Sequence, residues 1–191
     1  MKIGIIADTH GNLDGWRRAW EVLHDSDFIV HCGDLLYHGP RFDPAPGYNP
    51  RELAAALNAC PVPLLIARGN ADSEVDSLFV HAPIQSPYVF AQIEGQRLLA
   101  THGHRESLEK TIELAQQWRV DVLITAHLHV ATVGRYGDLL HLNPGTPTYP
   151  LAPDERLVRP TCAALVDGEA RFWALDTGEM IEGGAQLGKN A

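Results

Sequence analysis

The stretch Ile3-Gly-Ile-Ile-Ala-Asp-Thr-His10, near the start of the chain, joins a short apolar run to two residues that can bind a divalent metal. A continuous apolar run of this length is typical of a strand covered on both faces, as in a sheet flanked by helices. Asp8 and His10 are two positions apart, so in an extended chain their side chains project to the same face. The stretch therefore predicts a buried strand that ends in a metal-binding pair.

Four further apolar runs follow the same pattern, and each ends within four residues of a potential metal ligand. In chain order they are Phe28–Val30 before Gly33-Asp34, Leu64–Ala67 before Gly69-Asn70, Leu98–Ala100 before His102, and Val122–Ile124 before His127-Leu-His129. Ligands of such sheets bind at the carboxyl ends of the strands. Residues far apart in the sequence are therefore expected to converge on one edge of a sheet.

The residue types at this edge indicate which metals would bind. The predicted ligands are Asp8, His10, Asp34, Asn70, His102, His127 and His129. Carboxylate, imidazole and amide ligands without a thiolate suit Mn²⁺, Fe or Zn²⁺. A single catalytic zinc takes three protein ligands and a water, so seven ligands are too many for it. They suit two divalent ions about 3.5–4 Å apart, which can act on the attacking and leaving oxygens of a phosphoryl displacement. Mn²⁺ is the expected metal, with Fe, Zn²⁺ and Ni²⁺ as alternatives.

In these motifs, together with His102-Gly-His104, the chain resembles the calcineurin-like binuclear metallophosphoesterase superfamily. It is most similar to the small bacterial single-domain phosphodiesterases of the YfcE type, particularly over the stretches Gly33–Arg41 and Arg68–Asp76. The resemblance runs from Met1 to about Asp176. It implies an α/β fold in which two face-to-face mixed β-sheets form a sandwich flanked by helices. It also implies a hydrolase that acts on phosphodiesters.

The resemblance further implies how the ligands are shared. One metal would take Asp8, His10, Asp34 and His129, and the other Asp34, Asn70, His102 and His127, so that Asp34 bridges them. A hydroxide between the metals would be the nucleophile. Many members of the superfamily have a histidine after the asparagine of the third motif, which is thought to protonate the leaving group. This chain has Ala71 at that position.

Other residues near the motifs are candidates for catalysis or substrate binding. Besides the bridging Asp34, His104 and His38 are the candidate catalytic residues. His104 could donate a proton or only orient a ligand, and His38 could contact the scissile phosphate or be an exposed loop residue. The candidate substrate-binding residues are Asn70, Asn12 and Arg68. Asn12 could instead cap a helix, and Arg68 could instead pair with a carboxylate.

Composition sets the size and the class of the protein. The chain has 191 residues, 45% of them hydrophobic and 20% charged, which are ordinary values for one globular domain. We expect a single domain over residues 1–181 and a frayed, glycine-rich tail over residues 182–191. The net charge of −9 argues against strong nucleic-acid binding and favours a small phosphodiester as the partner.

Apolar runs and cysteines in the sequence indicate where the protein is located. No apolar run approaches the length of about 20 residues that a membrane span needs. Cys32, Cys60 and Cys162 form no CxxC pair, which is typical of a reducing compartment, so a cytoplasmic location is expected. A homodimer or homotetramer is the ordinary expectation for a soluble protein.

The remaining pattern predicts three helices and several hairpins. Apolar residues at helical spacing predict a helix from Leu13 to Leu23, and Asn49-Pro50-x-Glu52 predicts the start of a second that ends near Ala59. A third is expected from Ser107 to Trp118. Hairpin turns are predicted at residues 94–95, 136–137 and 167–168. The insert 37–49, which contains several Pro and Gly residues, is expected to line the mouth of the site.

Three other functional classes fit these motifs less well. A non-catalytic interaction scaffold of the same fold is the main alternative, although the complete ligand set counts against it. An amidohydrolase barrel needs about 250 residues, so the chain is too short for one. A haloacid-dehalogenase phosphatase needs a DxD motif, and this chain has Asp8-Thr-His10.

Overall fold

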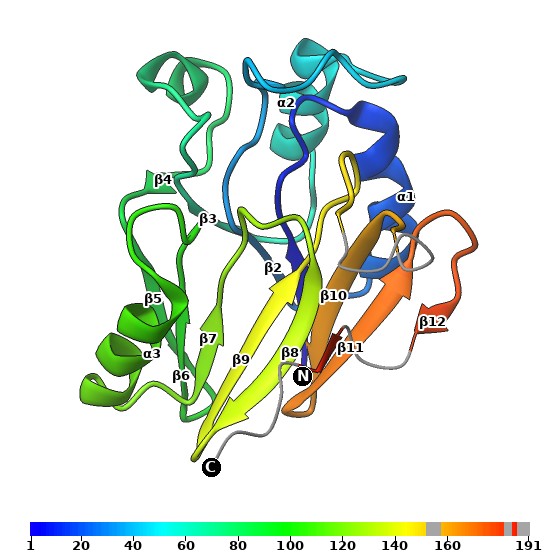
Figure 1. The fold of residues 1–191 in the computed structure, drawn as a ribbon. Helices are drawn as coiled ribbons and strands as arrows, with labels where there is room; N and C mark the ends of the chain where they lie inside the picture. The colour runs from blue at the N-terminus through cyan, green and yellow to red at the C-terminus, as the bar shows by residue number, and fades with distance from the viewer. Residues whose placement is uncertain (152–157, 182–184, 187–191) are drawn as a thin grey trace.

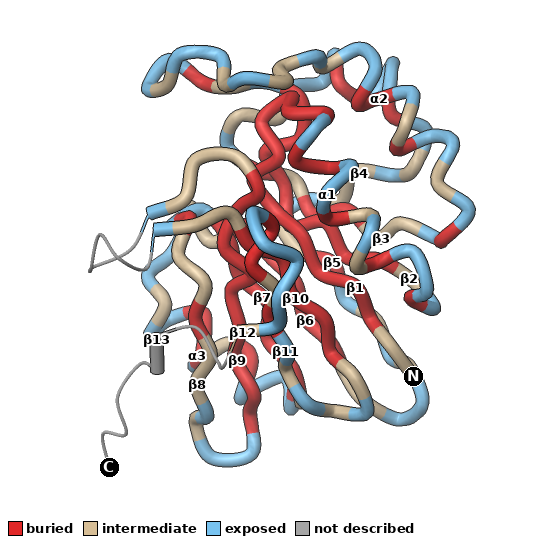
Figure 2. The backbone as a smooth tube through the Cα atoms, turned by 90° about the vertical axis from the view of Figure 1, so that its right-hand side faces the viewer, coloured by how far each residue is buried: buried red, intermediate tan, exposed pale blue. Residues whose placement is uncertain are grey.

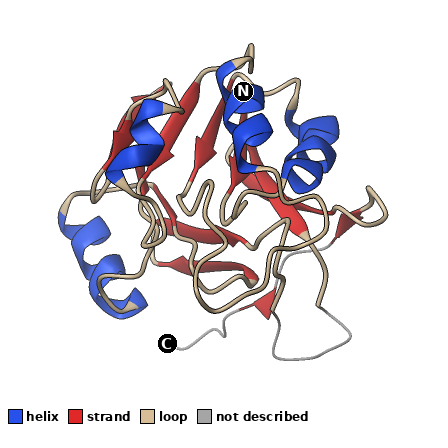
Figure 3. Ribbon diagram, turned by 90° about the horizontal axis from the view of Figure 1, so that it is seen from above, coloured by secondary structure: helices blue, strands red, loops and turns tan. Residues whose placement is uncertain are grey.

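The computed structural model describes residues 1–151, 158–181 and 185–186. It contains two mixed β-sheets packed face to face, with helices on the outside (Figure 1; Figure 3). The predicted sandwich is therefore confirmed. Within the described residues, no helix is both long and apolar enough to cross a membrane.

The first sheet has seven strands. They are β1 (Lys2–Ile6), β2 (Phe28–His31), β3 (Leu64–Ala67), β4 (Ile84–Gln85), β10 (Thr161–Val166), β11 (Glu169–Ala174) and β12 (Met180–Ile181). Their order is β12-β11-β10-β1-β2-β3-β4. Strands β1 to β4 pair in parallel, and β10 pairs with β1 in antiparallel fashion.

The second sheet has six strands. They are β5 (Val89–Ile93), β6 (Gln96–Ala100), β7 (Val122–Ile124), β8 (Ala131–Tyr136), β9 (Leu139–Pro144) and β13 (Ala185–Gln186). Their order is β13-β8-β9-β7-β6-β5, with β6, β7 and β9 in parallel. The three predicted hairpins are β5–β6, β8–β9 and β10–β11.

The described residues contain four helical segments, which are α1 (Leu13–Leu23), α2 (Pro50–Asn58), α3 (Leu108–Gln117) and the short 3₁₀ helix η1 (Glu74–Leu78). The three predicted α-helices agree with these bounds. Each has a polar N-cap, because the side chains of Asn12, Asn49 and Ser107 accept a backbone N–H from the first turn. The 3₁₀ helix and the two-residue strands were not expected from the sequence.

The core consists of three apolar clusters, one between the sheets and one on the outer face of each sheet. Figure 2 shows long buried stretches along the central strands. Side chains alternate along each strand, so that Ile3 and Ile5 of β1 face the second sheet while Ile6 faces α1 and α2. Helix α3 covers the outer face of the second sheet through residues such as Ile112 and Ala115. Both faces of the central strands are therefore buried, as the continuous apolar runs predicted.

The expected tail is only partly described. Residues 182–184 and 187–191 lie outside the described residues. Ala185 and Gln186, which the prediction assigned to the tail, form β13 and pair in parallel with Thr132 and Val133.

Candidate metal centre

The seven predicted ligands follow the carboxyl ends of β1, β2, β3, β6 and β7. Five of them adopt left-handed backbone conformations, with φ of 54° at Asp8, 45° at His10, 56° at Asp34, 70° at His127 and 58° at His129. Such values are uncommon outside glycine and cost of order 1–3 kcal/mol each, so they persist only where the surrounding structure holds them. The strand ends are therefore shaped to turn these side chains toward one another.

Glycine precedes two of the ligands because the chain is crowded there. A Cβ on Gly33 would overlap the backbone nitrogen of Gly69, and a Cβ on Gly69 would overlap the side chain of Asp34. The loops after β2 and β3 therefore cross at backbone contact. This close approach brings Asp34 and Asn70 to the same site and explains the Gly-Asp and Gly-Asn pairs.

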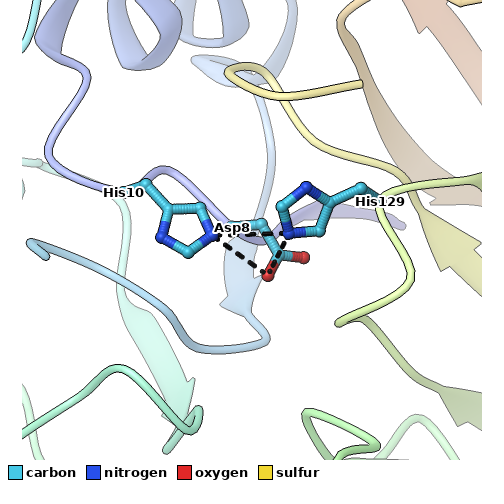
Figure 4. A group of neighbouring side chains, drawn as sticks. All are labelled: Asp8, His10 and His129. Atoms are coloured by element: carbon cyan, nitrogen blue, oxygen red, sulfur yellow. Dashed lines mark hydrogen bonds and ion pairs between the residues drawn. The ribbon is translucent and has the colours of Figure 1, made fainter. Parts of the chain in front are cut away.

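One group of ligand atoms comes from the ends of β1 and β7 (Figure 4). The Nε2 atom of His129 lies 3.4 Å from Asp8 Oδ1 and 3.4 Å from His10 Nε2. The His10 Nε2 atom lies 3.8 Å from Asp8 Oδ1. All three residues are buried. Three ligand atoms thus surround one small volume from different sides.

A second group is centred on His102. Its Nε2 atom lies 3.0 Å from Asn70 Oδ1, 3.3 Å from His127 Nδ1 and 3.4 Å from Asp34 Oδ2. His102 is fully buried, whereas Asn70 and His127 are exposed. The second group therefore opens toward solvent.

Asp34 lies between the two groups. Its Oδ2 atom is 3.4 Å from His102 Nε2 and 3.7 Å from His10 Nε2. Its other oxygen, Oδ1, accepts the backbone N–H of Ala71 at 2.7 Å. One carboxylate oxygen therefore faces both groups while the other is held by the backbone.

Backbone carbonyls orient three of the imidazoles. The Nδ1 atoms of His10, His102 and His129 lie 2.7–2.8 Å from the carbonyl oxygens of Tyr37, Cys32 and Tyr149. A carbonyl can only accept, so each Nδ1 carries the proton and each Nε2 presents a lone pair. This arrangement is the usual way in which proteins orient metal-binding histidines.

The buried oxygen Asp8 Oδ1 supports the same interpretation. Within the described residues it has no hydrogen-bond partner, and a buried carboxylate oxygen without one is costly. Its nearest imidazole neighbours are the Nε2 atoms of His129 and His10, which can bind a metal when the rings are neutral. A divalent cation among these atoms would satisfy all of them, so the residues present fit the metal site that the sequence predicted.

The protein without metal attracts protons to this site. Burial opposes a charge on His102, but Asp34 and Asp8 outweigh burial and raise its pKa to about 9. Burial likewise opposes a charge on Asp34, but the contact with His102 and the N–H of Ala71 lower its pKa to about 2. Both shifts show that the carboxylates create a strong demand for positive charge.

A cavity of about 440 Å³ lies over the ligands. The loop residues Tyr37–Phe42 form one wall, and Asn70–Ser73 form another. The predicted role of the 37–49 insert at the mouth of the site is confirmed for its first half. The Phe42 ring stacks on Tyr149 with centroids 4.3 Å apart and on His129 with centroids 5.7 Å apart.

Two of the candidate substrate-binding residues do not line the cavity. Asn12 is the N-cap of α1, where its Oδ1 accepts the N–H of Gly15, and it does not line the cavity. Arg68 pairs with Glu74 instead of facing the cavity. For both residues the structure therefore favours the structural alternative over a substrate contact.

The two candidate catalytic histidines also differ. His38 lines the cavity, and its Nδ1 lies 2.6 Å from the Gly39 carbonyl and 3.0 Å from the Phe42 carbonyl. The His104 ring lies 5.3 Å from that of His102, but it is not among the cavity-lining residues. Its buried Nδ1 has no hydrogen-bond partner in the part of the chain that the structure describes. Burial lowers the pKa of His104, so its imidazole is neutral near pH 7. The geometry favours His38 over His104 for contact with a substrate.

Two supporting residues were missed by the sequence analysis. The Asp72 carboxylate accepts the backbone N–H groups of Asp34, Leu35 and Gly69 at 2.7–2.9 Å. Thr146 Oγ1 donates to the Asp8 carbonyl at 2.8 Å. The contacts of Asp72 with Asp34 and Leu35 and the contact of Thr146 with Asp8 span 37 or more residues, so no local sequence pattern indicates them.

Comparison with known proteins agrees with this geometry. Residues 1–169 match the family model of the calcineurin-like phosphoesterase superfamily domain. The chain is 38% identical to the phosphodiesterase YfcE of Escherichia coli K12 over 152 residues, which cover 78% of this chain and 81% of that protein. It is 30% identical to a phosphodiesterase of Methanocaldococcus jannaschii over 156 residues, covering 76% of this chain and 83% of that protein.

Solved structures show the same fold. The structure of the phosphoesterase YfcE from E. coli superposes with a TM-score of 0.82 at 30% identity, covering 95% of this chain and 97% of that one. Vps29 of Chaetomium thermophilum superposes with a TM-score of 0.67 at 20% identity, covering 95% of each chain, and shows the fold alone. The chain belongs to the calcineurin-like phosphoesterase superfamily.

Proposed function

We propose that the protein is a metal-dependent phosphodiesterase that holds two divalent ions, with Mn²⁺ as the preferred metal. The observation that carries the proposal is the position of Asp34 Oδ2, within 3.7 Å of His10 Nε2 and 3.4 Å of His102 Nε2. A carboxylate oxygen there suits a bridge between two ions. The first ion would be held by Asp8, His10, Asp34 and His129, and the second by Asp34, Asn70, His102 and His127.

In this proposal the metals carry out the chemistry, and the chain orients the metals and the substrate. When bound, two divalent ions activate water and stabilise charge on the phosphoryl oxygens. The chain orients the ligands through the carbonyls of Tyr37, Cys32 and Tyr149 and through Asp72. Loop residues 37–42 would hold the substrate over the ligands. His38, which lines the cavity, is the proposed contact for the phosphate.

A diester is preferred to a monoester because of the charges around the cavity. Among its described lining residues, Arg41 is the one side chain with a permanent positive charge. A diester has one negative charge and a monoester has two, so a single arginine suits the diester better. The net charge of −9 further disfavours long nucleic acids.

A cytoplasmic enzyme is consistent with the cysteines. Cys32, Cys60 and Cys162 are all free thiols, and Cys32 and Cys162 are buried. Free thiols persist in reducing compartments. An assembly of two or four copies remains part of the proposal on general grounds, and measurement of the molar mass in solution by light scattering would test it.

The alternative of a non-catalytic scaffold is not favoured. A scaffold has no need for strained backbone at Asp8, His10, Asp34, His127 and His129 or for oriented imidazoles.

The deciding experiment is a screen of metal-stripped protein reloaded in turn with Mn²⁺, Ni²⁺, Fe²⁺ and Zn²⁺. Bis-p-nitrophenyl phosphate and p-nitrophenyl phosphate serve as the diester and the monoester. We expect hydrolysis of the diester to be faster, with Mn²⁺ among the best metals. A clear preference for the monoester would contradict the proposed substrate class, and metal binding without hydrolysis of either ester would favour the scaffold.

A further inference from the structure

A second cavity lies beside the one over the metal ligands. It has a volume of about 380 Å³, which is within the range of about 300–1,000 Å³ for small-molecule sites. Its walls come from the chain around Leu36, from α2 and from η1. We call it the side pocket; its apolar lining includes Leu36, Tyr37, Tyr48, Ala54, Val75 and Phe79.

The two cavities share a wall. Tyr37 lines both of them, and its carbonyl accepts the Nδ1 proton of His10. The ring of His38 lies 4.8 Å from that of Tyr37 and 5.2 Å from that of Tyr48. His38 lines the first cavity and Tyr48 lines the side pocket. His38, which lines the first cavity, therefore packs against two aromatic rings that line the side pocket.

The lining indicates a flat, apolar occupant. Tyr37, Tyr48 and Phe79 offer aromatic surfaces, and Val75 and Phe79 remain 56% and 53% exposed. The polar lining residues are Arg51 and Asp76, and Asp76 Oδ2 already accepts the N–H of Ser73 at 2.7 Å. Burying the exposed apolar surface under a planar group would be favourable.

The pocket suits one of the two ester groups of a diester better than the other. During hydrolysis the water oxygen bonds to phosphorus, and the leaving oxygen departs with the electron pair of its P–O bond. The leaving group therefore gains negative charge, which apolar walls disfavour. The other ester group stays neutral and remains on the phosphomonoester product. An apolar pocket suits this retained group.

We propose that the side pocket binds the retained ester group of the substrate, and that this group is planar and apolar, such as an aryl or a base-like ring. The proposal rests on the proposed phosphodiesterase function and names the part of the substrate that the chain selects.

The test compares two diesters with the same leaving group. Methyl p-nitrophenyl phosphate and 1-naphthyl p-nitrophenyl phosphate both release p-nitrophenolate and differ only in the retained group. The measured quantity is the ratio of their kcat/KM values, in unmodified protein and in the variants Val75→Ala and Phe79→Ala. Leu78→Ala is the matched control, because Leu78 lies on η1, is 76% exposed and does not line the side pocket.

We expect the unmodified protein to prefer the naphthyl ester, mainly through KM. Each truncation should lower the ratio about five- to tenfold, as expected for the loss of part of an apolar contact. Leu78→Ala should leave the ratio unchanged, and Phe79→Leu should restore part of it. Two results would overturn the proposal. One is an equal decrease of kcat/KM on both esters in the variants, and the other is equal kcat/KM values for the two esters in the unmodified protein.

A binding measurement separates this proposal from the proposed function. Calorimetry compares methyl (1-naphthylmethyl)phosphonate with methyl methylphosphonate on Mn²⁺-loaded protein. The naphthyl group is attached through a P–C bond, so it occupies the position of the retained group, and no hydrolysis is needed. If neither diester is hydrolysed but naphthyl binding is tighter and Phe79→Ala removes the difference, the proposed function fails and the side pocket stands. If the two phosphonates bind equally well, the proposed role of the side pocket is wrong, whether or not the protein hydrolyses diesters.

Discussion

The Asp72 carboxylate accepts the backbone N–H of Asp34 at 2.9 Å, although the two residues lie on different loops. The same oxygen accepts the N–H of Gly69 at 2.7 Å, and the other oxygen accepts that of Leu35 at 2.7 Å. Asp72 thus joins the loop that carries Asp34 to the loop that carries Asn70. No single motif reveals this link, yet two of the four proposed ligands of the second ion, Asp34 and Asn70, lie on the loops that it joins.

Replacing Asp72 should therefore loosen the metal site without removing a ligand. We expect Asp72→Ala to weaken metal binding about 10- to 100-fold, the usual effect of losing a residue that orients ligands. Titration of metal-stripped protein with Mn²⁺ would measure this. Asp138→Ala, in an exposed turn, is the control. Equal affinity in both variants would show that the loops hold their positions without Asp72.

The bridging position of Asp34 predicts different metal contents in two variants. Asp34→Ala removes the oxygen that faces both groups, so we expect it to lose both ions. Asn70→Ala removes a ligand of the second group only, so it should retain about one ion per chain. Elemental analysis after dialysis distinguishes the two results. Equal retention would contradict the bridge.

Ala71 predicts a dependence on the leaving group. A positioned general acid contributes typically about 10²–10⁴-fold, and alanine has no proton to give. In a plot of log kcat/KM against the pKa of the leaving group, the values should therefore fall with a steep slope. Ala71→His should flatten this slope by accelerating poor leaving groups, since the backbone N–H that binds Asp34 is retained.

The comparison uses a series of aryl and alkyl methyl phosphodiesters in both proteins. A shallow slope in the unmodified protein would mean that another acid acts. Loss of activity on poor leaving groups in His38→Ala, but not in His104→Ala, would then identify His38 as that acid.

His141 predicts a loss of stability in acid. It is 1% exposed, its Nε2 lies 2.8 Å from Thr125 Oγ1, and burial lowers its pKa to about 4. In the unfolded chain the pKa is about 6.5. Above pH 6.5 both states are neutral and His141 has no effect. As the pH falls, the unfolded state takes up a proton that the folded state refuses, so the free energy of unfolding decreases by about 2 kcal/mol at pH 5.

His141→Gln should remove this part of the pH dependence. Urea unfolding of metal-stripped protein at pH 7.5 and pH 5 gives the change in the free energy of unfolding for each protein. Comparing the changes, rather than the absolute values, cancels any packing effect of glutamine. Identical changes in the two proteins would show that His141 takes up no extra proton on unfolding.

Much of the fold followed from local patterns. The apolar runs located the five strands that carry the ligands, and capping residues such as Asn49 and Ser107 located helix starts. The ligand positions at strand ends followed from the general behaviour of parallel strands. Strands of two residues, such as β4 and β12, were missed because so short a segment carries no periodic signal.

The supporting residues could not be predicted, because they act across long sequence separations. Thr146 contacts the backbone of Asp8 from 138 positions away, and Phe42 stacks on Tyr149 through tertiary packing alone. Asn12 and Arg68 were candidates for substrate contact because they lie close to the motifs in sequence, with helix capping and ion pairing as the alternatives. In the structure Asn12 caps α1 and Arg68 pairs with Glu74.

The left-handed backbone at the ligands has a consequence for how the chain can change. Glycine would relieve the strain at His127, whose φ is 70° and whose side chain is exposed. Selection for folding alone would favour such a replacement, although it removes a proposed ligand of the second ion. Stability and activity are therefore opposed at this position, so a screen for heat resistance alone would select variants with a weakened metal centre.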